Sequence, residues 1–255
     1  MAIIIKSPNE IDAMRRAGIV VASILEILSK ETKAGMTTRQ LDDIAVKELA
    51  KCGATASFKG YGGFPASLCV SVNDEVVHGI PGDRIIHDGD IVSLDFGAIV
   101  DGFHGDAALS IGIGKISHQA KQLMEATRGS LEAGIAAARP GAHLSDISAA
   151  VQHYVESRGF SVVREYTGHG IGRDMHEDPQ IPNFGPPGHG PILRKGMTFA
   201  LEPMVNAGGW RTKVKKNRWT VVTADGSLSA HFEKDIAITD GEAEVLSPWK
   251  LDYSP

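Results

Sequence analysis

The sequence predicts an α+β fold in which two similar halves each contribute a pair of helices and antiparallel strands. Three observations predict it: capped amphipathic helix patterns near the start of the chain, the same order of elements further along, and β-branched segments bounded by turn signals. We expect the helices to cover one face of a curved sheet, with a cleft on the axis between the two halves.

The first predicted helix begins after Ser7, because this serine can cap it, a proline suits the first helical position, and a glutamate follows at the capping-box spacing. Apolar residues then recur at helical spacing up to about Ser29. The capping pattern recurs at 37–40 and starts a second predicted helix, which Gly53 ends.

The helix pattern reappears in the second part of the chain at a constant offset. Four positions of the first part match similar residues in the second: Leu25 with Leu131, Gly35 with Gly141, Leu41 with Ile147, and Gly53 with Gly159. The strand segment 89–95 likewise resembles 196–202, so that Asp95 corresponds to Glu202. Helix pairs and strands resemble each other in many proteins, but the matched carboxylates favour a duplication. We therefore expect one catalytic domain over residues 1–255, with pseudo-symmetric halves at about 7–112 and 113–240.

The strand predicted at 91–100 is apolar and β-branched, apart from Ser93 and Asp95. Asp101-Gly102 is a strong two-residue turn signal, which returns the chain beside this strand. Because the loop has an even length, Asp106 emerges on the same sheet face as Asp95, directly opposite or one diagonal step away. Two such carboxylates repel each other and lose hydration, unless a proton or a cation neutralises them.

Two more carboxylates lie in apolar segments of the second half. Glu202 falls in a strand predicted at 198–205, and Glu233 falls in another predicted at 231–236. The charged neighbours of Glu233 could form an ordinary ion-pair environment for it. The set of four acids is a stronger signal than any one member.

His169 lies in the run Gly168-His169-Gly170-Ile171-Gly172, where glycines allow close backbone approach and leave an imidazole exposed to a cleft. One histidine with four carboxylates suits two divalent first-row ions better than a structural zinc. Such ions, about 3.5–4 Å apart, would bind and activate one water. Five prolines and three glycines between Asp178 and Pro191 predict an irregular, ordered loop, a candidate rim of the site.

Composition excludes several other classes of protein. A net charge of −5 disfavours a nucleic-acid groove, and the basic cluster 211–218 suits a solvated hairpin. Cys52 and Cys69 lack paired metal spacing, so we predict a reducing compartment and no disulfide. No secretory or membrane-spanning segment is visible, which predicts a cytoplasmic protein.

Five motifs, in order and spacing, resemble those of the type I methionine aminopeptidases of bacteria: Asp95-Phe96-Gly97, Gly105-Asp106, Gly168-His169-Gly170-Ile171-Gly172, Glu202-Pro203-Met204 and His231-Phe232-Glu233. The resemblance spans nearly the whole chain, including residues 72–81 and 175–180. It implies the pseudo-twofold "pita-bread" fold and co-translational removal of the N-terminal methionine from nascent proteins whose second residue is small.

The resemblance also implies two divalent metal ions, of manganese, iron, cobalt or zinc. By position, Asp95 would chelate one ion, while Asp106 and Glu233 would bridge the pair. His169 and Glu202 would complete the coordination of the other ion. A monovalent cation is a further expectation of the resemblance, held by backbone oxygens near three residues: Asn73, Glu75 and Ser229.

Catalytic and substrate-binding roles follow from the same resemblance. Glu202 would relay a proton from the attacking water to the leaving amine, His176 would donate to the developing oxyanion, and His78 would donate to the peptide. The methionine pocket would be lined by five residues: Tyr61, Phe64, Cys69, Met175 and Trp219. Phe64 and Met175 replace the tyrosine and phenylalanine common in related bacterial enzymes, so the shape of the pocket is open.

We expect a monomer whose partner is the N-terminal methionine of nascent polypeptides, with transient contact with the ribosome and no membrane or sequence-specific nucleic acid. One alternative is a proline-specific enzyme of the same fold, such as aminopeptidase P or prolidase. Those enzymes usually carry a large preceding domain, whereas the first helix here begins near Ser7. Another is a binding module that has lost catalysis, which the intact ligand positions disfavour.

Overall fold

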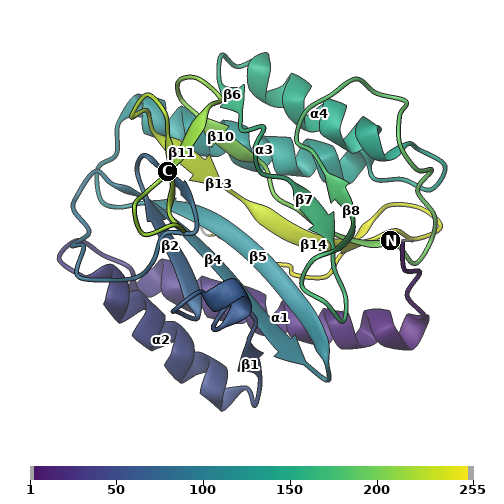
Figure 1. Ribbon diagram of the computed structural model, residues 1–255, viewed down its shortest axis with the longest axis horizontal. Helices are drawn as coiled ribbons and strands as arrows, with labels where there is room; N and C mark the ends of the chain where they lie inside the picture. Colours follow the sequence, from purple (N-terminus) through teal and green to yellow (C-terminus); the bar gives the residue numbers. More distant parts are fainter. Residues whose placement is uncertain (1–2, 252–255) are drawn as a thin grey trace.

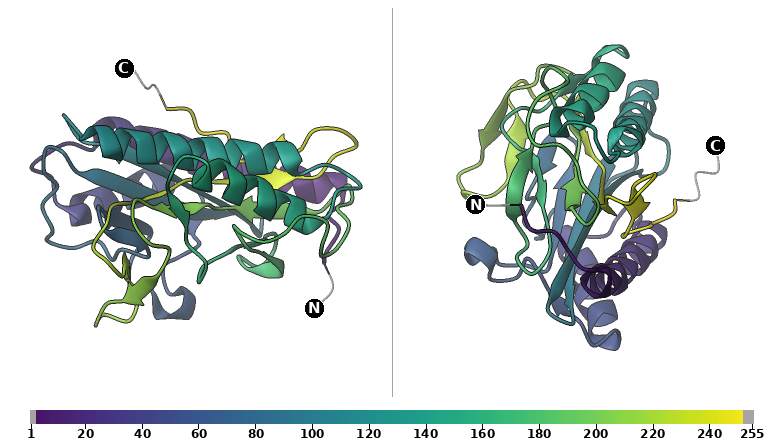
Figure 2. Two further views of the ribbon diagram at one scale, coloured as in Figure 1. Left: turned by 90° about the horizontal axis from the view of Figure 1, so that it is seen from above. Right: turned by 90° about the vertical axis from the view of Figure 1, so that its right-hand side faces the viewer.

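The computed structural model describes residues 3–251, and it confirms an α+β architecture (Figure 1). Helices α1 and α3 pack against the same face of the largest sheet, with α2 and α4 beside them (Figure 2). The bounds of the helices are Pro8–Glu31 (α1), Thr38–Lys51 (α2), His118–Ala137 (α3) and Leu144–Glu156 (α4). None of the helices within 3–251 has both the length and the apolar character needed to cross a membrane.

The two predicted N-terminal helices are confirmed at their first residues. Ser7 caps α1 and exchanges capping-box hydrogen bonds with Glu10, and Thr37 caps α2 in the same way with Gln40. Gly53, just after α2, has a φ of 64°, a left-handed conformation that glycine adopts without strain.

Over the described residues, the largest sheet has nine strands. Its main path is β1-β4-β5-β14-β9-β7-β8, while β2 pairs with β4 and β15 with β14. The strands are β1 (Thr55–Ala56), β2 (Leu68–Val72), β4 (Ile91–Val100), β5 (Phe103–Gly112), β7 (Gly168–Gly170), β8 (Glu177–Ile181), β9 (Thr198–Leu201), β14 (Glu233–Ala237) and β15 (Glu244–Val245). Because β5 pairs with β14, strands from distant parts of the sequence form one continuous sheet.

Two smaller sheets, β13-β10-β6 and β11-β12-β3, complete the strand pairing of the described residues. Their strands are β3 (Glu75–Val77), β6 (Ser161–Val162), β10 (Met204–Asn206), β11 (Thr212–Val214), β12 (Val221–Thr223) and β13 (Ser229–His231). A short 3-10 turn, η1 (Tyr61–Gly63), precedes β2.

Similar backbone contacts recur in the first and second parts of the chain. The amide of Gly35 donates to the Ile86 carbonyl at 2.8 Å, and the amide of Gly141 donates to the Leu193 carbonyl at 3.0 Å. Both glycines have a φ close to 90°, at 90° and 88°. These contacts agree with the pattern from which we inferred a duplication; the division into 7–112 and 113–240 stays a prediction.

Two predicted strands are interrupted, which corrects the expectation of continuous strands at 198–205 and 231–236. Between β9 and β10 the chain passes through Glu202 and Pro203. The ladder of β9 cannot continue through Pro203, because proline has no N–H to donate. Phe232 separates β13 from β14, and its amide donates to the Pro203 carbonyl at 3.4 Å. At these adjacent breaks, both segments of the chain cross between the large sheet, which contains β9 and β14, and the smaller sheet, which contains β10 and β13.

The loop predicted between Asp178 and Pro191 is wrong in its first part, because Glu177–Ile181 forms β8. Pro179 is tolerated there because β8 is the last strand on the path of the large sheet, where a missing donor breaks no ladder. Residues 182–191 are irregular as predicted, and the Asn183 side-chain amide donates to the backbone carbonyl of Glu202 at 3.0 Å.

Candidate metal centre

The β4–β5 hairpin brings Asp95 and Asp106 together, as predicted. The turn residues Asp101 and Gly102 have φ angles of 52° and 77°, which suit a tight two-residue hairpin. Asp95 pairs with Ala108, two residues from Asp106 on the same face of β5, so the carboxylates are diagonal neighbours.

The next strand adds a third acid to this face. Glu233, the first residue of β14, also pairs with Ala108, from the opposite side. Asp95 and Glu233 therefore flank the strand that carries Asp106, and all three side chains lie on one face of the sheet. Glu202 lies just beyond the end of β9, the strand that pairs with β14.

His169 reaches the same face from β7, and its flanking glycines are required by the packing. A Cβ atom at Gly168 would lie 2.5 Å from the Ala200 carbonyl oxygen, and one at Gly170 would lie 2.3 Å from that of Asp178. His169 is only 5% exposed to solvent between β8 and β9, and its side chain lines a cavity beside the carboxylates. Its Nδ1 lies 2.9 Å from the Gly170 carbonyl oxygen, which leaves Nε2 facing the carboxylates.

The four carboxyl groups strongly disfavour one another's charge. Burial raises the pKa of Asp106 to about 7, and burial followed by repulsion from neighbouring acids raises the pKa values of the other three well above normal: Asp95, Glu202 and Glu233. Within residues 3–251, no lysine or arginine forms an ion pair with any of them. Nε2 of His169 and Nε2 of His231 lie 3.6 and 3.7 Å from Glu202 oxygens, but burial lowers the pKa of both imidazoles to about 3. The described residues thus supply no positive charge to balance these four carboxyl groups.

The donor set fits divalent metal ions. Ligand atoms of Asp106, His169 and Glu233 all lie within 4.8 Å of one another. One oxygen of Asp95 and one of Asp106 are buried without a hydrogen-bond partner, so each has a free lone pair directed into protein instead of water. Carboxylate oxygens with one imidazole are ligands that first-row divalent ions accept.

A cavity of about 160 Å³ lies against these ligands. It is lined by every residue that the sequence placed in the site, joined by Phe58: Tyr61, Phe64, Cys69, His78, Asp95, Asp106, His169, Met175, His176, Glu202, Trp219 and Glu233. Phe64 meets the Trp219 ring edge to face, with centroids 5.1 Å apart, and both side chains form part of an apolar wall. The cavity therefore joins an apolar half to an ionisable half.

The two candidate donor histidines are neutral at pH 7. Burial lowers the pKa of His78 to about 4 and also lowers that of His176. Nδ1 of His176 lies 2.7 Å from the Tyr61 hydroxyl, which can donate to it and leave the proton on Nε2. His78 has a φ of 58°, and its backbone carbonyl accepts from the Thr220 hydroxyl at 3.3 Å.

Three residues near the site were missed from the sequence: Phe58, His231 and Asp235. The His231 ring nitrogen Nε2 lies 3.7 Å from Glu202 and has no hydrogen-bond partner. Its spacing of two from Glu233 places both side chains on one face of an extended segment, a signal that could have found it. Asp235 is buried and accepts from the Asp106 amide at 2.7 Å, so it supports the ligand strand instead of forming a surface ion pair.

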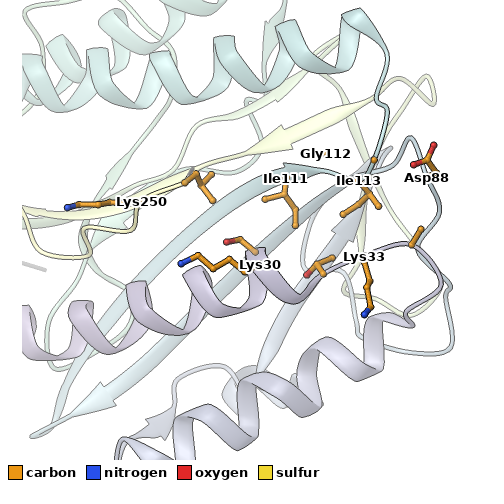
Figure 3. A pocket seen from close by; sticks show the side chains of 12 residues that line it. Lys30, Lys33, Asp88, Ile111, Gly112, Ile113 and Lys250 are labelled. Atoms are coloured by element: carbon orange, nitrogen blue, oxygen red, sulfur yellow. The ribbon is translucent and has the colours of Figure 1, made fainter. Parts of the chain in front are cut away.

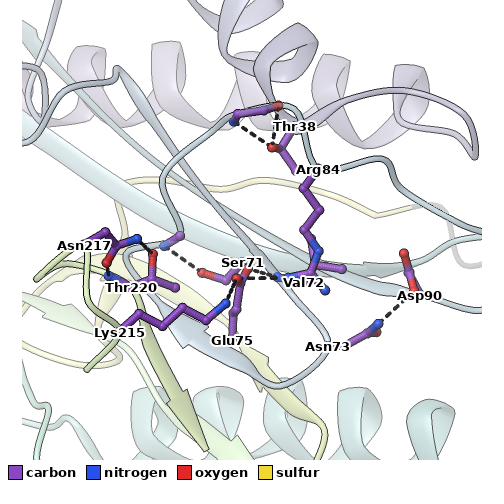
Figure 4. Close-up of polar contacts among 12 residues, drawn as sticks. Thr38, Ser71, Val72, Asn73, Glu75, Arg84, Asp90, Lys215, Asn217 and Thr220 are labelled. Atoms are coloured by element: carbon purple, nitrogen blue, oxygen red, sulfur yellow. Dashed lines mark hydrogen bonds and ion pairs between the residues drawn. The ribbon is translucent and has the colours of Figure 1, made fainter. Parts of the chain in front are cut away.

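Glu75, near the expected monovalent-cation site, has cationic partners of its own (Figure 4). Its carboxylate accepts from Lys215 at 2.6 Å, from Arg84 at 2.9 Å and from the Val72 amide at 2.9 Å. The side chain of Glu75 is therefore not a free cation ligand. A site built from backbone oxygens of Asn73, Glu75 and Ser229 stays a prediction.

A larger cavity, of about 540 Å³, lies elsewhere, at the end of α1 near Ile111 and Ile113 (Figure 3). Lys30, Lys33 and Lys250 line it, and it contains none of the convergent acids. Chemistry, not size, therefore distinguishes the metal centre among the cavities.

Comparison with known proteins agrees with this geometry. The model of metallopeptidase family M24 matches residues 12–240. The chain belongs to metallopeptidase family M24. Membership of this family, together with the donor set, indicates a site for divalent metal.

Proteins similar to this chain include "Methionine aminopeptidase 1" of Bacillus subtilis, which is 54% identical over 96% of this chain and 99% of its own length. The crystal structure of a methionine aminopeptidase from Thermotoga maritima superposes with a TM-score of 0.95 at 48% identity, covering 96% of this chain and 99% of that one. Prolidase from Pyrococcus furiosus shares the fold at a TM-score of 0.77 and 19% identity, over 97% of this chain and 66% of its own. The pita-bread fold expected from the sequence is thereby confirmed.

Proposed function

We propose that this chain hydrolyses the first peptide bond of polypeptides that begin with methionine followed by a small residue. The observation that carries the proposal is the convergence of four carboxyl groups and one imidazole on a cavity of about 160 Å³ that also has an apolar wall. Support comes from the 54% identity to a methionine aminopeptidase over nearly the whole chain.

Two divalent ions would be held by five residues: Asp95, Asp106, His169, Glu202 and Glu233. Asp106 is suited to a bridging role because it lies between Asp95 on β4 and Glu233 on β14. When bound, such ions lower the pKa of a water molecule and polarise a peptide carbonyl. Manganese, iron, cobalt and zinc all accept a donor set of carboxylates and one imidazole.

Three side chains would move or hold protons around the scissile bond. Glu202, whose side chain lines the cavity beside the other ligands, would accept the proton of the attacking water and deliver it to the leaving amine. Neutral His176 can donate from Nε2 to the oxygen that gains charge, since the Tyr61 hydroxyl can occupy Nδ1. Neutral His78 can donate to the peptide that follows.

The apolar half of the cavity would bind the methionine side chain. Phe64, Cys69 and Met175 are each about 5% exposed or less, and Trp219 closes the wall beside Phe64. A thioether is flexible and polarisable, so it packs well against aromatic rings and another methionine. The free α-amine would lie at the ionisable half, which accounts for a preference for chain ends.

Hydrolysis of Met-Ala-Ser and of an Xaa-Pro peptide by the metal-loaded protein tests the proposal. We expect cleavage of Met-Ala-Ser alone. Cleavage of the Xaa-Pro peptide alone would instead assign the proline-specific activity named for the Pyrococcus furiosus relative. A metal-loaded protein inert toward both peptides would favour a binding module.

The cellular setting is part of the same proposal. We expect a cytoplasmic monomer that acts on nascent chains and contacts the ribosome transiently. Light scattering during gel filtration measures the oligomeric state, and co-sedimentation with ribosomes at low salt measures the contact. A stable dimer, or a complete lack of co-sedimentation, would refute the corresponding part.

A further inference from the structure

A buried ion pair joins the N-terminal segment to the turn that carries His176. The Lys6 ammonium lies 2.5 Å from Glu177 Oε2, and the two side chains are only 2% and 4% exposed. Figure 1 shows the N-terminal segment beside β8, the strand that Glu177 begins. Removing two charges from water is costly, and an apolar pair of similar size is often as stable. Stability alone therefore does not account for this pair, so we consider what it holds in place beside His176.

The second oxygen of Glu177 organises the turn itself. Glu177 Oε1 accepts from the Arg173 amide at 3.0 Å, while the Gly172 amide donates to the Asp174 carbonyl at 3.1 Å. A Cβ atom at Gly172 would lie 2.4 Å from both Glu177 Oε1 and Lys6 Cε, so the turn packs directly on the ion pair. The turn at 172–177 is thus folded around the carboxylate of Glu177.

Lys6 is in turn fixed by its own backbone. Its amide donates to the Gly196 carbonyl at 2.7 Å, and it precedes Ser7, the cap of α1. The ion pair therefore connects the start of α1 and the segment before β9 to the turn at 172–177. Met175 and His176, which line the cavity, lie on this turn.

The His176 side chain lines the cavity and depends on its surroundings for orientation. Its ring contacts the Tyr61 hydroxyl at 2.7 Å and lies 4.3 Å, between centroids, from the ring of His169. Its neighbour Glu177 is held at both carboxylate oxygens, by the Lys6 ammonium and by the Arg173 amide. A hydrogen bond to a transition state needs this kind of fixed donor.

We propose that Lys6 is a positioning residue: its ion pair with Glu177 fixes the turn at 172–177 so that His176 can donate to the substrate carbonyl. This inference rests on the proposed function of His176. It assigns a role in the reaction to the segment before α1, which lies outside the cavity and contributes no metal ligand.

The combined variant Lys6→Met/Glu177→Gln tests the proposal without leaving an unpaired buried charge. The introduced amide keeps an oxygen that can accept from the Arg173 amide. With saturating metal, we expect kcat on Met-Ala-Ser to fall about 10-fold or more, with KM changed less than about twofold. Lys51→Met, which removes an exposed helical ion pair to Glu48, is the matched control and should leave both constants unchanged. Wild-type kcat in the combined variant would overturn the proposal.

A double-mutant cycle separates positioning from general weakening. If the ion pair acts through His176, then adding Lys6→Met/Glu177→Gln to His176→Ala causes almost no further loss of kcat, because the two changes remove the same interaction. If the losses multiply, the ion pair does not act through His176 and the proposal is refuted.

Hydrogen exchange of the metal-free protein provides a readout that does not depend on activity. In the combined variant, amides of 172–177 should exchange faster than in the wild type, while those of 212–223 stay unchanged. Equal exchange at 172–177 would refute the coupling of Lys6 to the turn. If the wild type cleaves no methionine peptide, the proposed function fails, and the exchange result still decides whether Lys6 orders this turn.

Discussion

Buried carboxylates occur in two kinds of surroundings in this molecule. Glu75 and Glu177 each meet a cationic side chain of the chain itself, Lys215 with Arg84 in one case and Lys6 in the other. Asp106 and Glu233 are as deeply buried, yet no lysine or arginine of the described residues pairs with them, and burial raises the pKa of each. The fold therefore balances Glu75 and Glu177 with its own cations and leaves the acids of the metal centre available to external ones. Asp235, which is also buried without a cationic partner among the described residues, accepts a hydrogen bond from the Asp106 amide instead.

The largest effect is expected from removing a charge at the centre of the uncompensated cluster. Asp106→Asn or Glu233→Gln should lower activity by about 10³-fold or more, because metal ions contribute several kcal/mol to the transition state. Both variants should also lose metal affinity, measured by calorimetric titration.

Glu75→Gln is the matched control for those two variants, because it removes a buried carboxylate that has its own cationic partners. It should retain full metal stoichiometry. If Asp106→Asn binds metal as well as Glu75→Gln does, the distinction between the two kinds of carboxylate is wrong.

His176→Ala should separate rate from metal binding. Losing one donor to a developing oxyanion costs about 10²-fold in kcat. Metal content should stay at the wild-type value, since His176 is bonded to Tyr61 and is not among the clustered ligands. Loss of metal together with rate would place this histidine among the ligands instead.

The acid sensitivity of the metal-free protein should depend on His78. Burial lowers the pKa of this imidazole to about 4, so between pH 6.5 and 4 the unfolded chain binds a proton that the folded state does not. Its stabilising contribution is present above pH 6.5 and is lost as the pH falls to 4, by an amount on the order of 3 kcal/mol.

His78→Asn tests this expectation, since asparagine tolerates the φ of 58°. As the pH falls from 7 to 4, the free energy of unfolding should decrease less for the variant than for the wild type. Parallel denaturation curves at all pH values would show that His78 does not titrate in this way.

The smallest effect is expected at the apolar wall. Trp219→Ala should raise KM for Met-Ala-Ser about 10-fold with little change in kcat or metal content, because pocket contacts with a side chain contribute about 1–3 kcal/mol. Trp210→Ala, in the same region of the chain but outside the cavity, is the control. An unchanged KM in Trp219→Ala would place the methionine side chain elsewhere.

Local patterns were sufficient to predict the helices and the ligand hairpin. The capping boxes at Ser7 and Thr37 fix helix starts within a few residues, and the even loop at Asp101-Gly102 fixes the face of Asp106. Each of these features depends on residues close together in the sequence, so the pattern alone specifies the geometry.

Features that depend on distant partners were not predictable in the same way. The break at Phe232 follows from two sheets that meet there, and the low solvent exposure of His169 follows from β8 and β9 packing on either side of β7. The pairing of Glu177 with Lys6 spans most of the chain, and no local pattern encodes it. Likeness to a family, rather than periodicity, supplied the pocket residues.

The most direct test is a calorimetric titration of the chelated protein with a divalent metal, followed by a crystal structure of the loaded form. The account predicts two ions per chain, both in contact with Asp106 and Glu233, and recovery of Met-Ala-Ser cleavage as they bind. A protein that binds no divalent ion at these carboxylates, or cleaves the peptide equally well without one, would contradict it.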